Sequence, residues 1–218
     1  MTTYVADTRS KEQNLFNFTG NKIKTVDKEI DVLVKYEQPL VVVLDSVLDA
    51  EECDRLIELS KNRLERSKIS ADKIVSDIRT SSGAFLTDVN DEIIKRVEKR
   101  VASIVGIPVE HAEGLHVINY KPGQEYKEHF DYFAETSRAA SNNRICTFVL
   151  YLSDVEDGGE TYFPKLGLKV YPKKGMAVYF EYFYNDQTLN ELTLHGGAPV
   201  VTGEKWIATL WFRRKKLL

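Results

Sequence analysis

The amino-acid sequence predicts a mainly β fold with flanking helices (α+β), built on an antiparallel sandwich or jelly roll. Short β-branched and aromatic runs follow one another through the C-terminal half, and two amphipathic helical patterns precede them. At 218 residues with 43% hydrophobic side chains, the chain can bury one sizeable core, and β sandwiches of this length are commonly single domains. We therefore expect one domain over residues 38–218, preceded by an N-terminal arm and entry segment over residues 1–37.

The N-terminal third predicts an arm, a strand and two helices. The first twenty or so residues are polar and without sustained periodicity, which suggests a loosely held arm or a dimer-contact segment. The continuous apolar run Pro39–Leu44 is typical of a buried strand. Asp49 followed by Glu52 predicts a capping box that opens a helix near 49–66, and a second helix near 90–105 ends close to Gly106. Each helix has one apolar stripe, formed by Cys53, Leu56, Ile57, Ser60 and Leu64 in the first, and by Ile93, Ile94, Val97, Val101 and Ile104 in the second.

From Leu115 onward the pattern becomes one of short strands separated by turn signals such as Lys121-Pro122-Gly123 and Asp157-Gly158-Gly159. The absence of helical periodicity between them favours antiparallel pairing over a parallel sheet with crossover helices. The predicted strands are Leu115–Tyr120, Arg144–Leu152, Leu168–Tyr171, Met176–Phe183, Glu191–His195 and Lys205–Arg213.

Composition excludes several classes of function. A net charge of −3 gives no basic footprint for nucleic acid, so a peptide or small molecule is the expected partner. The N-terminus has no apolar segment of the signal-peptide kind, and no uncharged apolar run reaches transmembrane length, which predicts a cytoplasmic protein without membrane contact. Cys53 and Cys146 lie far apart and form no C-x-x-C pattern, so we expect free core thiols.

Three residues of the C-terminal half form a candidate metal site. His129 and Asp131 stand two apart, which on a β-strand would place both side chains on the same face. His195 could return to them through the intervening strands. Two histidines and one carboxylate form the facial ligand set of non-haem Fe(II) oxygenases, which leaves three positions on the metal for co-substrate and O₂. A bare H-x-D pattern is weak evidence, but a returning histidine and Lys205 ten residues later strengthen it.

Several longer stretches carry a resemblance to a known family. These are Tyr126–Phe133, Gly158–Pro164, Leu194–Gly197, Gly203–Trp206 and, upstream, Asp77–Gly83. Together they make the chain similar to the prolyl 4-hydroxylases among the 2-oxoglutarate/Fe(II) dioxygenases, most closely to the small soluble bacterial members. The resemblance spans about residues 38–214 and implies a double-stranded β-helix core.

The resemblance also implies a co-substrate site. A buried ammonium needs a counter-ion, which a dicarboxylate supplies, and the family's lysine at the position of Lys205 grips the distal C5 carboxylate of 2-oxoglutarate. Tyr120 and Thr161 fall where the family has supporting hydroxyl groups. Fe(II), 2-oxoglutarate and O₂ are thus the expected cofactor and co-substrates, with ascorbate as the expected reductant.

On the substrate side the resemblance nominates Arg144, Tyr126 and Trp211. One departure from the pattern is Arg213, since collagen-type members carry a histidine there; a contact with the C1 carboxylate of 2-oxoglutarate, or the control of decarboxylation, is therefore expected to differ. Residues 75–82 could form a mobile lid over a peptide groove. His111 and His116 lack metal-ligand spacing and are interpreted as structural histidines.

The expected function is 2-oxoglutarate- and Fe(II)-dependent hydroxylation of prolyl residues at the 4-position in peptides or proteins, with succinate and CO₂ as products. Two alternatives stay open: the same chemistry on another residue or a free amino acid, and a catalytically silent peptide-binding module. Retention of His129, Asp131, His195 and Lys205 together argues against the silent module. The protein is expected to be a monomer or a homodimer.

Overall fold

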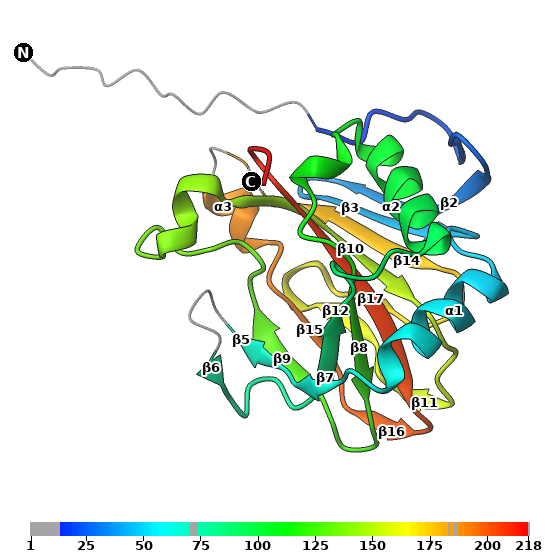
Figure 1. The fold of residues 1–218 in the computed structure, drawn as a ribbon. Coiled ribbons are helices and arrows are strands. Elements are labelled where there is room, and N and C mark those ends of the chain that lie inside the picture. Colours follow the sequence, from blue (N-terminus) through cyan, green and yellow to red (C-terminus); the bar gives the residue numbers. More distant parts are fainter. Residues whose placement is uncertain (1–13, 70–73, 183, 185–186, 218) are drawn as a thin grey trace, which may run out of the picture.

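The largest element of the structure is a nine-stranded antiparallel sheet (Figure 1). The structure is a computed structural model that describes residues 14–69, 74–182, 184 and 187–217. The sheet confirms the prediction of antiparallel pairing, and the strand predicted over Lys205–Arg213 has those bounds. In spatial order the strands are β1 (Lys22–Lys24), β2 (Glu29–Glu37), β3 (Leu40–Asp45), β14 (Ala177–Glu181), β10 (Arg144–Tyr151), β17 (Lys205–Arg213), β8 (His116–Tyr120), β7 (Ser82–Phe85) and β4 (Glu65–Arg66).

A smaller antiparallel sheet of four strands packs against one face of the large sheet, which gives the expected sandwich. Its strands are β13 (Leu168–Val170), β12 (Thr161–Phe163), β15 (His195–Gly197) and β9 (Tyr126–His129). Two further strand pairs lie beside these sheets, β11 (Asp157–Gly158) with β16 (Val200–Thr202) and β5 (Lys68–Ile69) with β6 (Ile74–Val75).

Both faces of the central strands of the large sheet are buried, and the alternation of side chains along each strand divides them between two cores. On β3, Leu40, Val42 and Leu44 join the core that contains the helices, whereas Val41 and Val43 face the smaller sheet. This double burial explains why such strands read as continuous apolar runs rather than as alternating patterns. The core between the sheets also takes Ile118, Tyr120, Val149, Tyr151, Phe163, Val170, Val178, Phe180, Val200 and Ile207.

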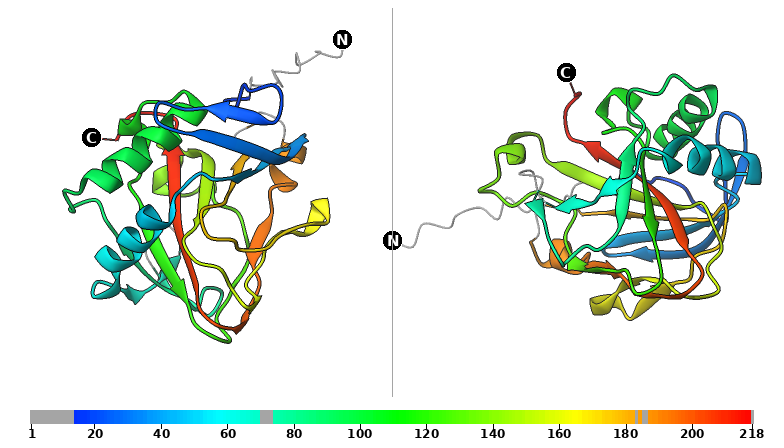
Figure 2. Two further views of the ribbon diagram at one scale, coloured as in Figure 1. Left: turned by 90° about the vertical axis from the view of Figure 1, so that its right-hand side faces the viewer. Right: turned by 60° about the horizontal axis from the view of Figure 1, so that its bottom comes forward.

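Helices α1 (Ala50–Lys61) and α2 (Glu92–Val105) cover the outer face of the large sheet (Figures 1 and 2). The predicted capping box is present, because the Asp49 side chain accepts from the Glu52 backbone N–H and the Glu52 side chain accepts from that of Asp49. Helix α1 ends before the predicted residue 66, so Leu64 lies outside it. Gly106 ends α2 in the left-handed conformation, with φ of 65°.

Short helices occupy several connections. They are the 3-10 turns Val109–His111, Arg138–Asn142 and Pro164–Leu166, and the α-helical turn α3 (Gln187–Glu191). The strand predicted over Glu191–His195 is therefore wrong over most of its length: the chain is helical up to Glu191, and β15 begins only at His195. The Thr193 hydroxyl bonds to the backbone carbonyl of Asn190, which extends the turn after α3 and competes with strand pairing.

The segment before residue 38 is more closely integrated than the predicted arm. Strands β1 and β2 join the edge of the large sheet, and Phe16, Ile23 and Ile30 are buried in the helix-side core. Polar residues separate these buried positions, so the sequence shows no continuous apolar run that would predict a strand there. Residues 1–13, on which much of the prediction of an arm rests, lie outside the described residues.

A buried ion-pair network ties the helices to the turn between β1 and β2. Arg100 on α2 is 1% exposed and donates to both carboxylate oxygens of Glu52, which is fully buried on α1. The same guanidinium donates to Asp27 and to the Val47 carbonyl oxygen. Burial alone would raise the pKa of Glu52, but the hydrogen bonds from Arg100 and the Asp49 backbone lower it to about 2. Arg96 also donates to Glu52, so two guanidinium groups balance the two carboxylates of this network.

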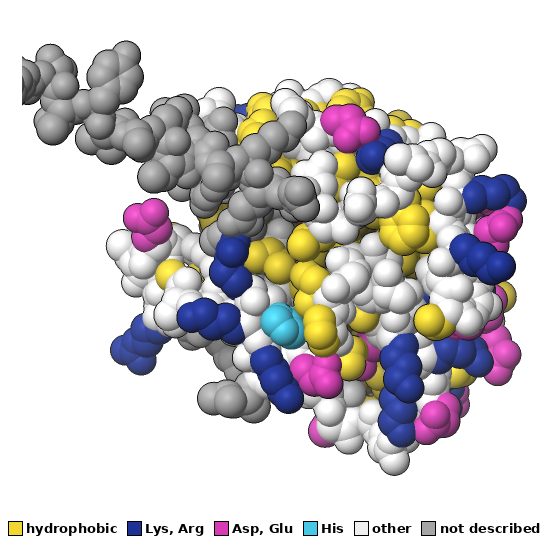
Figure 3. Space-filling view, turned by 90° about the horizontal axis from the view of Figure 1, so that it is seen from above, with side chains coloured by type: hydrophobic (Ala, Val, Ile, Leu, Met, Phe, Trp, Pro, Cys, Tyr) yellow, Lys and Arg dark blue, Asp and Glu magenta, His cyan; other side chains and the backbone are white. Residues whose placement is uncertain are grey.

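The molecular surface mixes both signs of charge with hydrophobic side chains on the face seen from above (Figure 3). Among the described residues, no helix combines the length and the apolar character needed to cross a membrane. Both cysteines are free and buried, as expected for core thiols.

Replacing Arg100 by leucine should destabilise the fold by about 3–5 kcal/mol, because Glu52 is then left buried without its main partner. Urea unfolding followed by circular dichroism measures this loss as a lower transition midpoint. The control is Arg63→Leu, which breaks an ion pair with Asp88 at the surface and should cost less than about 1 kcal/mol. Equal midpoints for the Arg100 variant and the parent would show that the network contributes no stability.

Candidate functional site

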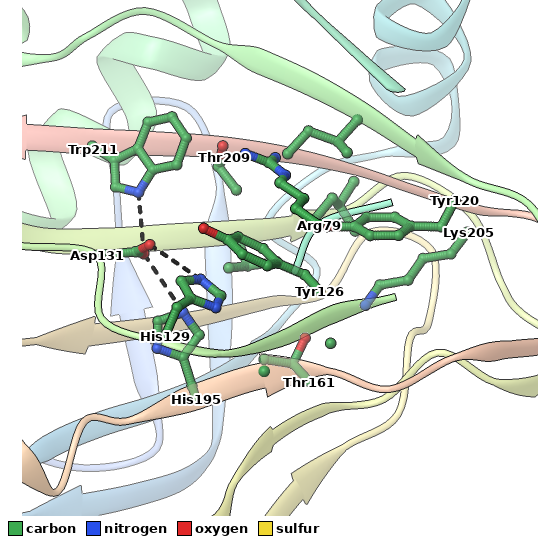
Figure 4. A pocket seen from close by; sticks show the side chains of 15 residues that line it. Arg79, Tyr120, Tyr126, His129, Asp131, Thr161, His195, Lys205, Thr209 and Trp211 are labelled. Atoms are coloured by element: carbon green, nitrogen blue, oxygen red, sulfur yellow. Dashed lines mark hydrogen bonds and ion pairs between the residues drawn. The ribbon is translucent and has the colours of Figure 1, made fainter. Parts of the chain in front are cut away.

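A pocket with about 410 Å³ of empty space, part of it open to solvent, lies between the two sheets (Figure 4). The large sheet contributes alternate residues of β17, namely Lys205, Ile207, Thr209 and Trp211, because every second side chain of this strand faces inward. The smaller sheet contributes residues of β9, β12 and β15. All predicted site residues except Arg144 line this pocket.

His129, Asp131 and His195 meet at one place in the pocket. His129 on β9 and His195 on β15 are directly opposite in the strand register. The His129 Nε2 atom lies 3.4 Å from Asp131 Oδ1, and the His195 Nε2 atom lies 3.7 Å from Asp131 Oδ2. One ligand atom from each of the three residues lies within 4.8 Å of the other two, so a single metal ion could contact all three.

Hydrogen bonds fix the orientation of each candidate ligand. The Nδ1 atom of His129 lies 2.8 Å from the Lys127 carbonyl oxygen, and that of His195 lies 2.9 Å from the Thr193 carbonyl oxygen. Because a carbonyl oxygen only accepts, each Nδ1 carries the proton and each Nε2 presents a lone pair to the pocket. This is the tautomer that metal binding requires.

The Asp131 carboxylate is held by the large sheet. Its Oδ2 atom accepts a hydrogen bond from the Thr147 hydroxyl at 2.7 Å. The same atom accepts one from the Trp211 indole N–H at 3.1 Å (Figure 4). His129 and Asp131 do not share a strand, because β9 ends at His129. The chain turns after Phe130, and Asp131 crosses toward β10 and β17 to reach its two donors.

The charge states of the cluster suit metal binding. Burial would raise the pKa of Asp131, but attraction from His195, His129 and Arg144 outweighs this effect and holds the pKa well below its usual range. Burial and the neighbouring His129 lower the pKa of His195 to about 4. Near neutral pH the pocket therefore holds an ionised carboxylate and a neutral His195 imidazole, the forms that ligate metals.

Lys205 lies at the other end of the pocket and is 2% exposed. Its ammonium is 5.4 Å from the centre of the Tyr120 ring and 6.0 Å from that of Tyr151, and no ion pair to it occurs within the described ranges. Burial lowers the pKa of Lys205 to about 7 against a partial opposing effect of Glu160. Thr161 lines the same end, with its hydroxyl accepting from Tyr151 at 2.8 Å. No carboxylate of the described residues forms an ion pair with Lys205, and the Thr161 hydroxyl at this end could contact a bound anion.

Aromatic and cationic side chains surround the histidine end. Tyr126 stacks on the His129 ring, with 3.4 Å between ring centres, and Arg79 lies over the Tyr126 ring at 4.8 Å. Arg144, which does not line the pocket, lies behind Trp211 with its guanidinium 3.9 Å from the ring centre. It donates to the Asp131 backbone carbonyl oxygen at 3.2 Å.

Three residues of the site were missed by sequence reasoning. Thr147 and Tyr151 sit in the apolar run of β10 and face the pocket side only because of their register with Trp211 and Ile207. Arg79 falls in the segment expected to be a lid, but it is buried, lines the pocket and forms a β-bridge with Tyr126. The only sequence feature that marks Arg79 as a candidate site residue is its position between a polar run and Gly83.

Arg213 does not line the pocket. It forms an ion pair with Glu113 and donates to the Asn142 carbonyl oxygen, and it is not among the lining residues. Arg213 therefore makes no contact with the pocket that would support the expected difference at the C1 carboxylate of 2-oxoglutarate. The two remaining histidines lie outside the cluster, with His111 Nδ1 bonded to the Arg213 carbonyl oxygen and His116 buried in the sheet.

Comparison with known proteins agrees with this geometry. Residues 115–213 match the model of the 2OG-Fe(II) oxygenase superfamily. Prolyl 4-hydroxylase 5 of Arabidopsis thaliana is 41% identical over 199 residues, which cover 80% of this chain and 68% of that protein. The solved structure of the viral collagen prolyl hydroxylase from Paramecium Bursaria Chlorella virus-1, in its 2OG complex, is 31% identical with a TM-score of 0.63, over 79% of this chain and 95% of that chain.

A prolyl-4-hydroxylase of Pseudomonas putida, 21% identical with a TM-score of 0.57, covers 80% of this chain and 92% of its own and shares the fold. The fold is the double-stranded β-helix of this superfamily, as the sequence resemblance implied.

Removing the carboxylate from the cluster should abolish tight metal binding without unfolding the protein. Asp131→Ala deletes the only anionic ligand candidate, so Fe(II) affinity measured by anaerobic equilibrium dialysis should fall more than about 100-fold. His111→Ala is the matched control and should keep the parent's affinity, because His111 bonds to backbone outside the cluster. Metal binding that survives in the Asp131 variant, or is lost in the His111 variant, would contradict the assignment.

Proposed function

Because the chain belongs to the prolyl 4-hydroxylase family of the 2OG-Fe(II) oxygenases, we propose that it hydroxylates prolyl residues of peptides or proteins at the 4-position, with 2-oxoglutarate and O₂ as co-substrates and succinate and CO₂ as products. The observation that carries this proposal is one pocket with two unlike ends. A cluster of two histidines and a carboxylate lies at one end, and a buried lysine without an ion pair among the described residues lies at the other.

His129, Asp131 and His195 would hold the iron. The donor set fits Fe(II), because two imidazole nitrogens and one carboxylate oxygen, the ligand types of non-haem iron sites, lie close together in the pocket. When bound, Fe(II) supplies the redox chemistry that activates O₂ with 2-oxoglutarate. Thr147 and Trp211 hold the Asp131 carboxylate in place, and the carbonyl oxygens at Lys127 and Thr193 hold the two imidazoles.

Lys205 would bind the C5 carboxylate of 2-oxoglutarate. A buried ammonium at low dielectric gains strongly from an anion, and this pocket presents the ammonium together with Tyr120 and the Thr161 hydroxyl. The other end of the co-substrate would then point toward the histidine cluster, which lines the same pocket.

Tyr126, Trp211 and Arg144 would shape the place where the target proline binds. Tyr126 and Trp211 line the pocket beside the histidine cluster and offer aromatic faces to a pyrrolidine ring. Arg144 packs on the back of Trp211 and fixes the indole that donates to Asp131. These side chains also keep water from the reacting centre.

The family assignment also supports one finer proposal, which concerns the reductant. Ascorbate would restore iron that is oxidised in uncoupled turnover. A homodimer and a cytoplasmic location stay predictions from the sequence. The alternatives of another substrate residue, a free amino acid or a silent peptide-binding module are outcomes of the experiment below.

The proposed function predicts hydroxylation of peptidyl proline. The protein with Fe(II), 2-oxoglutarate and ascorbate should add 16 mass units to proline-rich and collagen-like peptides, an atomic mass difference of one oxygen, and should release about one succinate per oxygen added. Fragmentation mass spectra locate the oxygen, and free proline serves as the control substrate. Oxygen on another residue, turnover of free proline alone, or peptide binding without succinate would each support the corresponding alternative instead.

Lys205→Ala should weaken 2-oxoglutarate binding by well over tenfold. The C5 carboxylate then enters a partly desolvated site without its cation, a loss of about 2–5 kcal/mol for truncated buried charge pairs. Lys205→Arg should rescue only in part, because a planar fork replaces a compact ammonium. Anaerobic titration of 2-oxoglutarate into the Fe(II) protein, followed by the metal-to-ligand absorption band, measures binding apart from turnover. Parent-like affinity in the alanine variant would place the carboxylate clamp elsewhere.

The same titration in the parent protein should depend on pH in a definite direction. Burial lowers the pKa of free Lys205 to about 7, whereas the bound carboxylate favours its charged form. Above pH 7 binding therefore requires uptake of a proton, and affinity should fall by up to about tenfold per pH unit. The Lys205→Arg variant is the control, since arginine stays charged and should remove this slope.

A further inference from the structure

Two arginines face each other beside the pocket. Arg144 on β10 and Arg213 on β17 are directly opposite in the strand register, a position where like charges destabilise a sheet. Their side chains are 15% and 14% exposed, so water screens neither charge well. Such an arrangement needs a compensating interaction.

A single carboxylate lies between the two guanidinium groups. Arg144 donates to both oxygens of Glu113 at 2.7 Å, and the Nε–H of Arg213 donates to Glu113 Oε1. The Phe133 ring lies next to both, with centroid distances of 4.7 Å to Arg144 and 4.6 Å to Arg213. The other contacts are with the neutral carbonyl oxygens of Asp131 and Asn142 and with the Trp211 ring. The Asp131 carboxylate also attracts Arg144, so the less compensated charge is that of Arg213.

The cluster of Arg144, Arg213 and Glu113 therefore carries one excess positive charge. Within the part of the chain that the structure describes, neither arginine forms an ion pair with any other carboxylate. A poorly solvated charge without a full counter-ion is costly, so an anion bound here would be favoured.

The position of Arg213 along β17 indicates which ligand could supply that anion. Lys205, Trp211 and Arg213 are on the same face of the strand, with Trp211 beside the histidine cluster. At about 3.3 Å per residue, Arg213 lies about 26 Å from Lys205 and about 7 Å beyond Trp211. A short dicarboxylate at Lys205 cannot reach Arg213, whereas a peptide whose proline sits at Trp211 extends past it.

We propose that Arg213, together with Arg144, determines substrate specificity by favouring peptides with a carboxylate about two residues from the target proline. An extended peptide spans the distance of about 7 Å with two residues, which sets the position of the acidic group. The proposal rests on the proposed function. A side-chain carboxylate and a free C-terminus present the same chemistry, and the test separates them.

The experiment compares matched peptides that differ only one or two residues on either side of the target proline. Each position carries Asp, Asn or Lys in turn, and a further pair ends two residues after the proline in a free or an amidated C-terminus. Anisotropy of labelled peptides on the anaerobic Fe(II) and 2-oxoglutarate protein gives affinity without turnover, and hydroxylation under air gives kcat/KM. At low ionic strength, and for one of the substituted positions, the Asp peptide should bind at least about fivefold more tightly than the Asn peptide. The Lys peptide should bind less tightly than the Asn peptide.

Variants of Arg213 assign the preference to this side chain. Arg213→Gln should bring the Asp-to-Asn affinity ratio close to one, Arg213→Lys should keep most of it, and Arg213→Glu should favour the Lys peptide. The affinity for 2-oxoglutarate reports whether the pocket itself is intact in each variant. Lys215→Gln removes an equal charge from an exposed neighbouring position and should keep the parent's ratio.

The outcomes separate this inference from the proposed function. Equal affinity for Asp and Asn peptides at every position, or a preference that Arg213→Gln leaves unchanged, would overturn the role of Arg213 while hydroxylation persists. A preference confined to the free C-terminus would identify the terminal carboxylate as the group bound. If no proline peptide binds or is hydroxylated, the proposed function fails and this inference fails with it.

Discussion

The nine-stranded sheet has no solvent-exposed face along its central strands, and the rest of the molecule depends on this constraint. Each central strand sends alternate side chains to the helix-covered core and to the pocket side. On β17, Ala208, Leu210 and Phe212 seal the helix side. A shift in register by one residue would place Lys205 and Trp211 among the helices, so packing of the helix-side core fixes the position of the candidate site.

Burial also sets the electrostatic character of the site. The network of Arg100, Arg96, Glu52 and Asp27 balances its own charges and has a structural role. The charged groups on the pocket side differ: Lys205 has no ion pair among the described residues, Asp131 faces two imidazoles, and two arginines share Glu113. In the proposed function each of these groups meets a ligand of opposite charge, namely a dicarboxylate, a metal cation and an acidic peptide. The charged groups on the pocket side are thus incompletely compensated in the folded chain, and each would gain from a ligand of opposite charge.

Much of the fold and site could be predicted from local patterns. The bounds of β17, the capping box of α1 and the Gly106 end of α2 follow from residue types that act locally. The convergence of His129, Asp131 and His195 was suggested by motif spacing and family resemblance, and the structure places these side chains together. Their roles as ligands stay a proposal.

The parts that could not be predicted depend on long-range contacts. Asp131 leaves the strand of His129 because its hydrogen-bond donors, Thr147 and Trp211, come from the opposite sheet. Arg79 reaches the pocket through a bridge to Tyr126, which no local pattern reveals. The stretch before β15 reads as a strand, yet α3 and the turn after it occupy that region.

The most direct test of the central claim is a crystal structure of the protein grown anaerobically with Mn(II), as an unreactive substitute for Fe(II), and 2-oxoglutarate. Anomalous scattering locates the metal without reference to any assumed ligand. The account predicts a single strong peak in contact with the Nε2 atoms of His129 and His195 and a carboxylate oxygen of Asp131, with the distal carboxylate of 2-oxoglutarate at Lys205. A metal bound elsewhere, or a co-substrate that leaves the Lys205 ammonium without an anion, would contradict it.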